Sequence, residues 1–384
     1  MKKVLKLLIP IVLLTVSFCG CNYESQELKS RLIVQAIGID AMENGGVRVT
    51  LQTLNTEMAG NPNSGANLGD IINFVTVEGN TVSDAISAAA KSVGKLPLLS
   101  QNRLIVFGRE TAEQGIYSHL DYFVRNADNR ATVLVAVSDT TAEDLVSAKM
   151  GESILTANSI EDILKAMQFN TNIINQELYK LINKLECPCS NAFLPVLKAE
   201  QEEGGEKADI RFVNVAVFDE DQILFEMENE AVTALMMLHN QVEHGYFSVQ
   251  NQDFSAETVV KIRHCSVKVK PQSTDGGVHF TVRVNMEVDI AEIQTETPFS
   301  INEAYLNETQ RLCHEYIVHL LEEETKNCFV NYNADPYCLG RWFKRSLPKE
   351  FKAIPDWKKN LPSAKIEVLP KIEINRVGNG AENI

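Results

Sequence analysis

The sequence predicts an α+β fold of two to three domains, in which mixed sheets are packed with helices and one long helix lies in the C-terminal domain. At 384 residues the chain is too long for one ordinary core. Its 45% hydrophobic and 23% charged residues are typical of a globular protein. Short runs with strand alternation are interleaved with runs of helical periodicity, and this mixture predicts α+β architecture.

The N-terminal half begins with a β-hairpin. Residues 32–40 are a continuous apolar run, residues 47–54 alternate between apolar and polar, and Asn44-Gly45-Gly46 supplies a tight turn between them. The Gly- and Asn-rich stretch 59–70 is expected to be a loop. A helix begun by Thr81 and Asp84 and a strand at 104–107 are expected after it. They are followed by a helix with Ile116, Leu120, Phe123 and Val124 on one face and by a strand at 131–137. The last elements expected in this half are a helix over 142–149 capped by Thr140 and Glu143, and helices at 158–169 and 172–185.

The charged segment 199–209, which contains Gly204-Gly205, is the expected linker between the two halves, because the pattern of elements restarts after it. The predicted divisions are a lipoprotein signal peptide over 1–20, N-terminal α+β structure over 21–198, the linker, a C-terminal α+β domain over 210–377 and a loose tail over 378–384.

The C-terminal half is expected to hold the longest helix of the chain. Ser300-Ile301-Asn302-Glu303 is a capping box, and an apolar stripe then continues for about 30 residues until Asp335-Pro336 ends the helix. Such a stripe is typical of a helix laid across a sheet. The other elements expected here are strands at 213–218 and 223–225, a helix around 232–238, strands at 257–270 and 278–293, and a last strand pair around 366–374.

The first 21 residues have the layout of an export signal. Lys2, Lys3 and Lys6 precede an apolar run of 12 residues, Leu7 to Phe18, which is shorter than the roughly 20 residues a membrane span needs. Gly20 directly before Cys21 indicates a cysteine-directed cleavage site, at which the Cys21 thiol receives a diacylglycerol and becomes the new N-terminus. The alternatives are an ordinary secretory signal followed by a disulfide-forming Cys21, or an uncleaved anchor.

The charge of the chain excludes two classes of partner. The formal net charge is -15, and it becomes more negative when the three signal lysines are removed. A strongly acidic surface argues against nucleic acid and against electrostatic adhesion to anionic lipid, because both attract Lys and Arg. The Cys21 lipid, rather than charge, is therefore expected to hold the protein to a membrane.

Six cysteines lie beyond the signal region, and their spacing leaves the disulfide connectivity open. They are Cys187, Cys189, Cys265, Cys313, Cys328 and Cys338. A disulfide across one residue is expected to be strained, so Cys187-Pro188-Cys189 is interpreted as a turn with two small residues. A metal or redox site there is the alternative, and it lacks a neighbouring His.

The residues show no recognisable catalytic pattern. The sequence contains no phosphate-binding loop, dinucleotide fingerprint or nucleophile elbow. His239 and His244, like His314 and His319, are five residues apart, which places their imidazoles on different helix faces, so they are expected to be surface or helix-flank residues. Glu202-Glu203 and Glu322 to Glu324 are interpreted as solvated faces. Trp342 and Trp357 are expected in the core, with a partner-binding surface as the alternative.

Several segments, in order, resemble the Ger(x)C lipoproteins, the C subunits of spore germinant receptors. Residues 33–40 resemble the family's opening strand after its lipidated Cys, and residues 215–230 resemble its central motif. Its C-terminal signature is matched by Asp335-Pro336, Gly340-Arg341, Trp357 and the terminal strands up to Gly378. Asn22-Tyr23-Glu24-Ser25 departs from the Trp-Asp-Arg-Arg sequence that often follows the family's Cys.

The resemblance implies a non-enzymatic, lipid-anchored subunit on the outer face of the inner spore membrane, without a cofactor. Its expected partners are an A-type and a B-type integral-membrane receptor subunit, in a receptor triggered by small nutrients. The alternatives are an extracytoplasmic solute-binding lipoprotein of an importer, for which the halves would be similar lobes, and an extracytoplasmic hydrolase, which would need a nucleophile or metal set.

Overall fold

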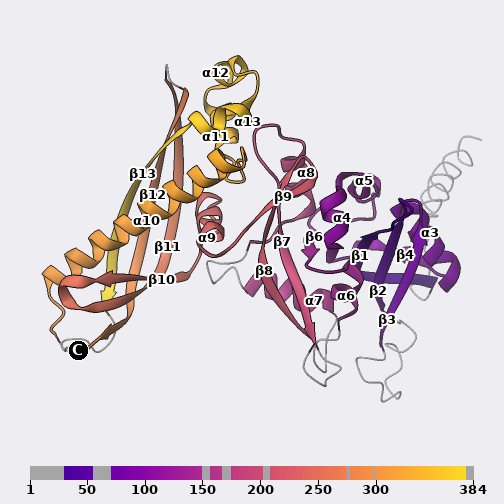
Figure 1. Cartoon of the computed structure of the whole chain (residues 1–384). Helices are drawn as coiled ribbons and strands as arrows, with labels where there is room; N and C mark the ends of the chain where they lie inside the picture. Colours follow the sequence, from indigo (N-terminus) through magenta and orange to yellow (C-terminus); the bar gives the residue numbers. More distant parts are fainter. Residues whose placement is uncertain are drawn as a thin grey trace, which may run out of the picture.

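The computed structural model describes residues 30–54, 71–148, 156–166, 174–201, 208–274, 277–296 and 299–377. Within these ranges the chain forms a nine-stranded mixed sheet followed by a four-stranded sheet. In Figure 1 the first sheet and its helices occupy the right half of the molecule, and the second sheet and a long helix occupy the left half. The expected α+β class, with a long helix in the C-terminal half, is confirmed.

The first sheet has the order β3-β2-β1-β5-β6-β7-β8-β9, and β4 also pairs with β1. Strands β1, β5, β6 and β7 run parallel in its centre, and the strands on either side are antiparallel. Its strands are β1 (Arg31–Ala41), β2 (Val47–Leu54), β3 (Ile72–Gly79), β4 (Leu96–Leu98), β5 (Leu104–Phe107), β6 (Leu134–Ser138), β7 (Phe193–Gln201), β8 (Ala208–Asp219) and β9 (Gln222–Met227).

Helices cover both faces of this sheet, as central parallel strands require. One face packs against residues of α3 (Val82–Val93), α4 (Arg109–Gln114), α5 (Tyr117–Arg125) and α8 (Leu178–Leu185). The other face packs against α6 (Ala142–Ser147) and α7 (Thr156–Ala166). On α5 the expected apolar face is confirmed for Ile116, Leu120 and Phe123, whereas Val124 is exposed.

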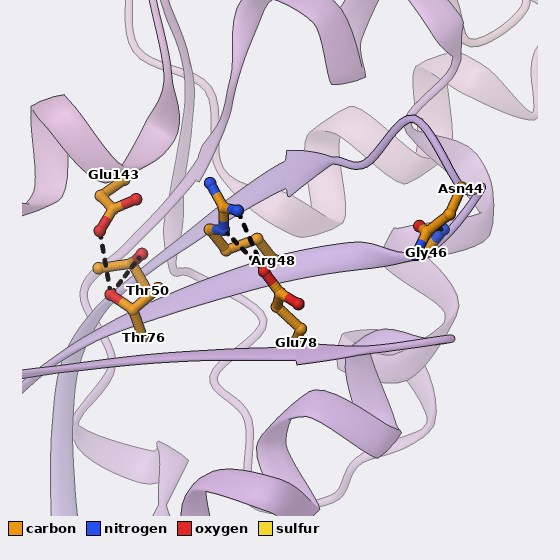
Figure 2. A network of polar contacts seen from close by, with 7 residues as sticks. All are labelled: Asn44, Gly46, Arg48, Thr50, Thr76, Glu78 and Glu143. Atoms are coloured by element: carbon orange, nitrogen blue, oxygen red, sulfur yellow. Dashed lines mark hydrogen bonds and ion pairs between the residues drawn. The ribbon is translucent and has the colours of Figure 1, made fainter.

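The opening hairpin forms as expected. The Asn44 side-chain oxygen accepts a hydrogen bond from the Gly46 amide at 3.0 Å, which fixes the turn between β1 and β2. Both residues are drawn in Figure 2. Across β2 and β3, Arg48 forms a 3.0 Å ion pair with Glu78. These side chains are exposed, so the pair favours the register more than it adds stability.

The end of β1 holds helix α6 in place. The Asp40 carboxylate accepts hydrogen bonds from the amides of Ala142 at 2.7 Å and Glu143 at 3.0 Å, the first residues of α6. The helix cap is Thr141, whose hydroxyl accepts from the Asp144 amide, so the cap expected at Thr140 is wrong by one residue. Thr76 of β3 adds a 3.2 Å hydrogen bond to Glu143 (Figure 2).

The second sheet has the order β10-β11-β12-β13 and is crossed by helix α10 (Glu303–Asn331), as its apolar stripe predicts. Buried Cys313, Ile317, Leu320 and Phe329 of α10 share one core with residues of β11 and β12. The strands are β10 (Gly245–Asn251), β11 (Ala256–Thr274), β12 (Gly277–Thr295) and β13 (Lys365–Val377), and the short helices α11 (Leu339–Ser346), α12 (Pro348–Ala353) and α13 (Trp357–Asn360) lie between α10 and β13. The last strand pair expected at 366–374 is the single strand β13, which pairs with β12 in parallel.

The segment 199–209, expected as a linker, differs in the structure. Its residues 199–201 end β7 and its residues 208–209 begin β8, and the two strands pair with each other; residues 202–207 lie outside the described residues. The chain instead leaves the first sheet after β9 through α9 (Asn229–Leu238), which lies between the two sheets (Figure 1). Phe193 and Val217 of the first sheet share a core with α9 and the second sheet, so the two sheets are packed together.

The sequence does not predict strand β7. Its apolar run follows a turn that contains Cys and Pro, and the run itself contains Pro195, which is unusual inside a strand. The cap of α10 is also different: Asn302, rather than Ser300, is the N-cap, and its side chain accepts from the Tyr305 amide at 2.9 Å. Within the described ranges, no helix is both long enough and apolar enough to cross a membrane. The signal region, the 59–70 loop and the tail after 377 lie outside those ranges.

Replacing Asn302 with Ala should lower the free energy of unfolding by about 1 kcal/mol, because the Tyr305 amide loses its acceptor. Asn302→Asp keeps an acceptor and should remain within about 0.5 kcal/mol of the unaltered protein. Urea unfolding followed by circular dichroism measures both. A larger loss from Ser300→Ala than from Asn302→Ala would place the cap at the start of the capping box instead.

Candidate functional site

Two buried polar residues, Asn191 and Asp335, meet where the two sheets pack together. Asn191 lies in the turn before β7, and Asp335 follows α10. The backbone amide of Asp335 donates to the Asn191 side-chain oxygen at 2.8 Å, and the backbone carbonyl of Asp335 accepts from the backbone amide of Asn191 at 2.9 Å. The Asn191 side-chain nitrogen donates to the Phe218 carbonyl of β8 at 2.8 Å. One asparagine thus ties α10, β8 and the turn before β7 together.

The carboxylate of Asp335 is fully buried and holds the start of helix α11. It accepts hydrogen bonds from the amides of Leu339 at 3.0 Å and Gly340 at 2.6 Å. Burial raises the pKa of Asp335 to about 7, even though these amide hydrogen bonds favour the charged form. The junction therefore contains a carboxyl group that titrates near neutral pH.

Gly340 allows the closest approach at the junction. A Cβ atom at this position would collide with the Trp357 indole nitrogen and with the Cys189 carbonyl oxygen. Trp357 is 5% exposed and packs against the rings of Phe280, Phe343 and Phe351. The expected core position of Trp357 is confirmed. Asp335, Gly340 and Trp357, which resemble the C-terminal signature described above, lie together in one cluster.

Cys187 and Cys189 are joined by a disulfide, which corrects the expectation of two small residues in a turn. The turn itself is present, and it brings their Cα atoms to 5.2 Å, within the usual range for a disulfide. The bond closes the segment between α8 and β7, immediately before Asn191.

A cavity of about 690 Å³ opens beside the junction. Its walls come from both halves of the chain. Tyr117, Cys187 and Asp221 belong to the part of the chain that forms the first sheet and its helices, whereas Phe351 and Trp357 belong to the short C-terminal helices. The Asp221 carboxylate accepts a 3.1 Å hydrogen bond from the Tyr117 amide, which fixes that wall. The cavity has the size and mixed lining of a small-molecule pocket.

Lys184, which also lines this cavity, and His239 lie at the same junction. Lys184 is 6% exposed, donates to the Gln176 side-chain oxygen at 3.1 Å and lies 3.3 Å from the centre of the Phe193 ring. Burial lowers the pKa of Lys184 to about 7. Burial and the nearby Lys184 lower the pKa of His239 to about 3, so its neutral ring donates to the Pro336 carbonyl at 2.8 Å.

The remaining residues singled out from the sequence lie in different parts of the fold, except that His239 and Trp342 line one groove beside the junction. His314 and His319 are exposed on α10, His239 is the C-cap of α9, and Trp342 is partly buried. Glu322 is half-buried, and its carboxylate accepts from the Val368 amide at 3.1 Å, so it is not simply a solvated charge. Cys21 and Glu202-Glu203 lie outside the described residues.

The buried thiols are unsuited to nucleophilic chemistry. Burial raises the pKa of Cys265, Cys313 and Cys328 to about 12, and it also raises the pKa of Cys338, so the thiolate is disfavoured at each position. Within the described residues, no group of three or more His, Cys, Asp or Glu side chains is placed to hold a metal ion. The geometry of the junction is that of a packed interface with a cavity.

Sequence reasoning missed Lys184 and Asn191. Lys184 had a signal: it follows Leu178 and Leu181 at three-residue spacing, so it lies on the apolar face of α8, where a charged residue is unusual. Asn191 had none, because its partner Asp335 is 144 residues away in the chain.

Comparison with known proteins gives this architecture its class: the chain is a spore germination protein. Residues 24–199 match the family model described as "Spore germination protein N-terminal domain", and residues 214–378 match "Spore germination B3/ GerAC like, C-terminal". The chain belongs to the Ger(x)C family, as its motifs suggest.

Two further comparisons agree with this assignment. Spore germination protein KC of Bacillus subtilis (strain 168) is 23% identical over 402 residues, which cover 97% of this chain and 96% of the relative. The crystal structure of the GerBC protein superposes with a TM-score of 0.57 at 14% identity, covering 88% of this chain and 96% of that chain. At that identity the superposition shows a shared fold.

Replacing Gly340 with Ala should lower the free energy of unfolding by about 2–4 kcal/mol, because the new methyl group displaces Trp357 or the Cys189 carbonyl. Gly94→Ala is the matched control: this glycine has φ +72° but open space around it, so its cost is only the backbone strain of about 1 kcal/mol. Denaturant unfolding monitored by tryptophan fluorescence compares them. Equal losses in the two variants would contradict the close contact at Gly340.

The raised pKa of Asp335 should make stability depend on pH. A carboxyl group with a pKa near 7 when folded and near 3.8 when unfolded binds more protons in the folded state, so its contribution falls as pH rises from about 4 to 7. The difference in unfolding free energy between the unaltered protein and Asp335→Asn should therefore decrease by about 2–3 kcal/mol from pH 5 to pH 8. Denaturant titrations of both proteins measure this difference, and a value independent of pH would contradict the shift.

Proposed function

We propose that this protein is the lipid-anchored C-type subunit of a nutrient germinant receptor, and that it supports receptor assembly and signalling during spore germination. Cys21 would carry the lipid and hold the folded domains at the outer face of the inner spore membrane. The partners would be an A-type and a B-type integral-membrane subunit. The proposal also treats the chain as non-enzymatic.

The observation that carries the proposal is the match of both family models, in order, over most of the chain. The shared core and the buried Asn191–Asp335 contact support a single packed body, which suits a subunit that docks on membrane partners. The raised thiol pKa values at the buried cysteines agree with a non-catalytic role.

The decisive experiment compares dipicolinate release from spores with and without this gene, across amino acids, sugars and nucleosides. Loss of the response to one nutrient class, with normal germination by dipicolinate itself, is the expected result. An unchanged response across the whole panel, in a strain without redundant receptors, would refute the receptor role. Direct binding of a transported nutrient by the purified chain would then favour an importer's solute-binding lipoprotein.

Cys21→Ala should move the protein from the membrane fraction to the soluble fraction and reproduce the germination defect of the deletion. The reason is that each buried CH₂ of the lipid contributes about 0.8 kcal/mol to anchoring, and the variant loses all of them. Cys265→Ala, which removes a buried thiol of the second sheet, is the matched control and should remain in the membrane fraction. Immunoblots of fractionated spores measure both. Membrane retention of Cys21→Ala would contradict the anchor.

A further inference from the structure

A second groove, of about 650 Å³, crosses the junction between helices α8 and α11. It differs from the first cavity in its charge. Lys180 and Lys184 of α8 face Arg341 and Arg345 of α11 across it, and in the described part of the chain no Asp or Glu side chain lines it. Four basic side chains therefore converge on one groove of a protein whose net charge is -15.

Most of these cations lack an internal counterion. Lys180 is paired with Glu177 at 2.5 Å, but Lys184, Arg341 and Arg345 form no ion pair with any described residue. Arg341 and Arg345 are exposed, and in the same ranges their guanidinium groups make no hydrogen bond. Their donors remain available for a ligand, since an arginine presents five N–H groups.

Two buried side chains, Lys184 and Gln176, line the same groove. The Lys184 ammonium has three N–H bonds, and within the described residues its one hydrogen-bond acceptor is the Gln176 side-chain oxygen. That contact turns the Gln176 side-chain nitrogen away from Lys184, and this nitrogen has no hydrogen-bond partner among the described residues although Gln176 is only 1% exposed. The other N–H bonds of Lys184 have no hydrogen-bond acceptor among the described residues, so an acceptor bound in the groove would satisfy them.

We propose that the groove between α8 and α11 binds a small oxyanion, a carboxylate or phosphate group, with Lys184 and Gln176 at its floor and Arg341 and Arg345 at its rim. The lysine and arginine side chains that line the groove offer only donors, which matches a ligand that accepts hydrogen bonds. Arginine side chains bind carboxylate and phosphate with two parallel hydrogen bonds. The partly buried Trp342 lines the groove and offers an apolar wall for the rest of the ligand.

The electrostatics of the groove without a ligand agree with this assignment. Burial, together with the charges of Arg341 and Lys180, lowers the pKa of Lys184 to about 7. A bound anion would act in the opposite direction and stabilise the ammonium form. The overall negative charge of the protein disfavours non-specific binding of anions to its surface.

The test is isothermal titration calorimetry on the purified full-length protein in non-ionic detergent. The probes are inorganic phosphate and succinate, which separate the two oxyanion types, and succinamide as the neutral counterpart of succinate. Saturable binding of phosphate or succinate, without binding of succinamide, is expected. Arg341→Gln and Arg345→Gln, which alter exposed residues and should leave the fold intact, should each weaken binding by about tenfold.

Arg283→Gln is the matched control, because Arg283 is an exposed arginine of β12, away from the groove. It should change the affinity by less than about twofold. The proposal fails if neither anion binds, if succinamide binds as well as succinate, or if Arg283→Gln weakens binding as much as the groove variants. Binding of an acidic peptide alone would also refute a small-molecule site. The measurement uses the isolated protein, so its outcome is independent of the receptor role.

Discussion

The reciprocal contact between Asn191 and Asp335 is the constraint on which the rest of the architecture depends. It joins segments 144 residues apart, and both residues are buried, so a broken contact would leave backbone and side-chain polar groups unpaired at a cost of about 1–3 kcal/mol each. The Asp335 carboxylate then fixes the start of α11, and α11 places Gly340 against Trp357. The residues of the family's C-terminal signature in this region therefore form one packed junction.

Packing at this junction carries the hydrophobic core across the segment where the composition changes. The segment 199–209 is charged and contains paired glycines, which is typical of a linker, but here its described residues belong to the paired strands β7 and β8. The two family models also end and begin near this segment, at residues 199 and 214. The core nevertheless continues across, because Phe193 and Val217 pack with α9 and the second sheet.

Local features of the fold could be predicted from the sequence. Asn44-Gly45-Gly46 specifies the first turn through a contact two residues apart, and Thr81 caps α3 through a contact three residues apart. Features that depend on distant partners could not be predicted. Nothing near Asn191 indicates Asp335, and the capping-box pattern that begins at Ser300 does not indicate that Asn302 is the cap of α10. Lys184 could have been identified from the sequence, because it is a charged residue on the apolar face of helix α8.

The same junction sets the spacing of the basic side chains in the groove between α8 and α11. Lys184 belongs to the first half of the chain and Arg341 to the second, so their separation is set by the contact that ties those halves together. Opening the halves like the lobes of a hinged binding protein would expose the shared core and unpair Asn191 and Asp335. The basic side chains are thus held near one another before any ligand arrives, against their mutual repulsion. A preformed site of this kind loses little binding free energy to conformational closure, and it acts as part of one rigid body.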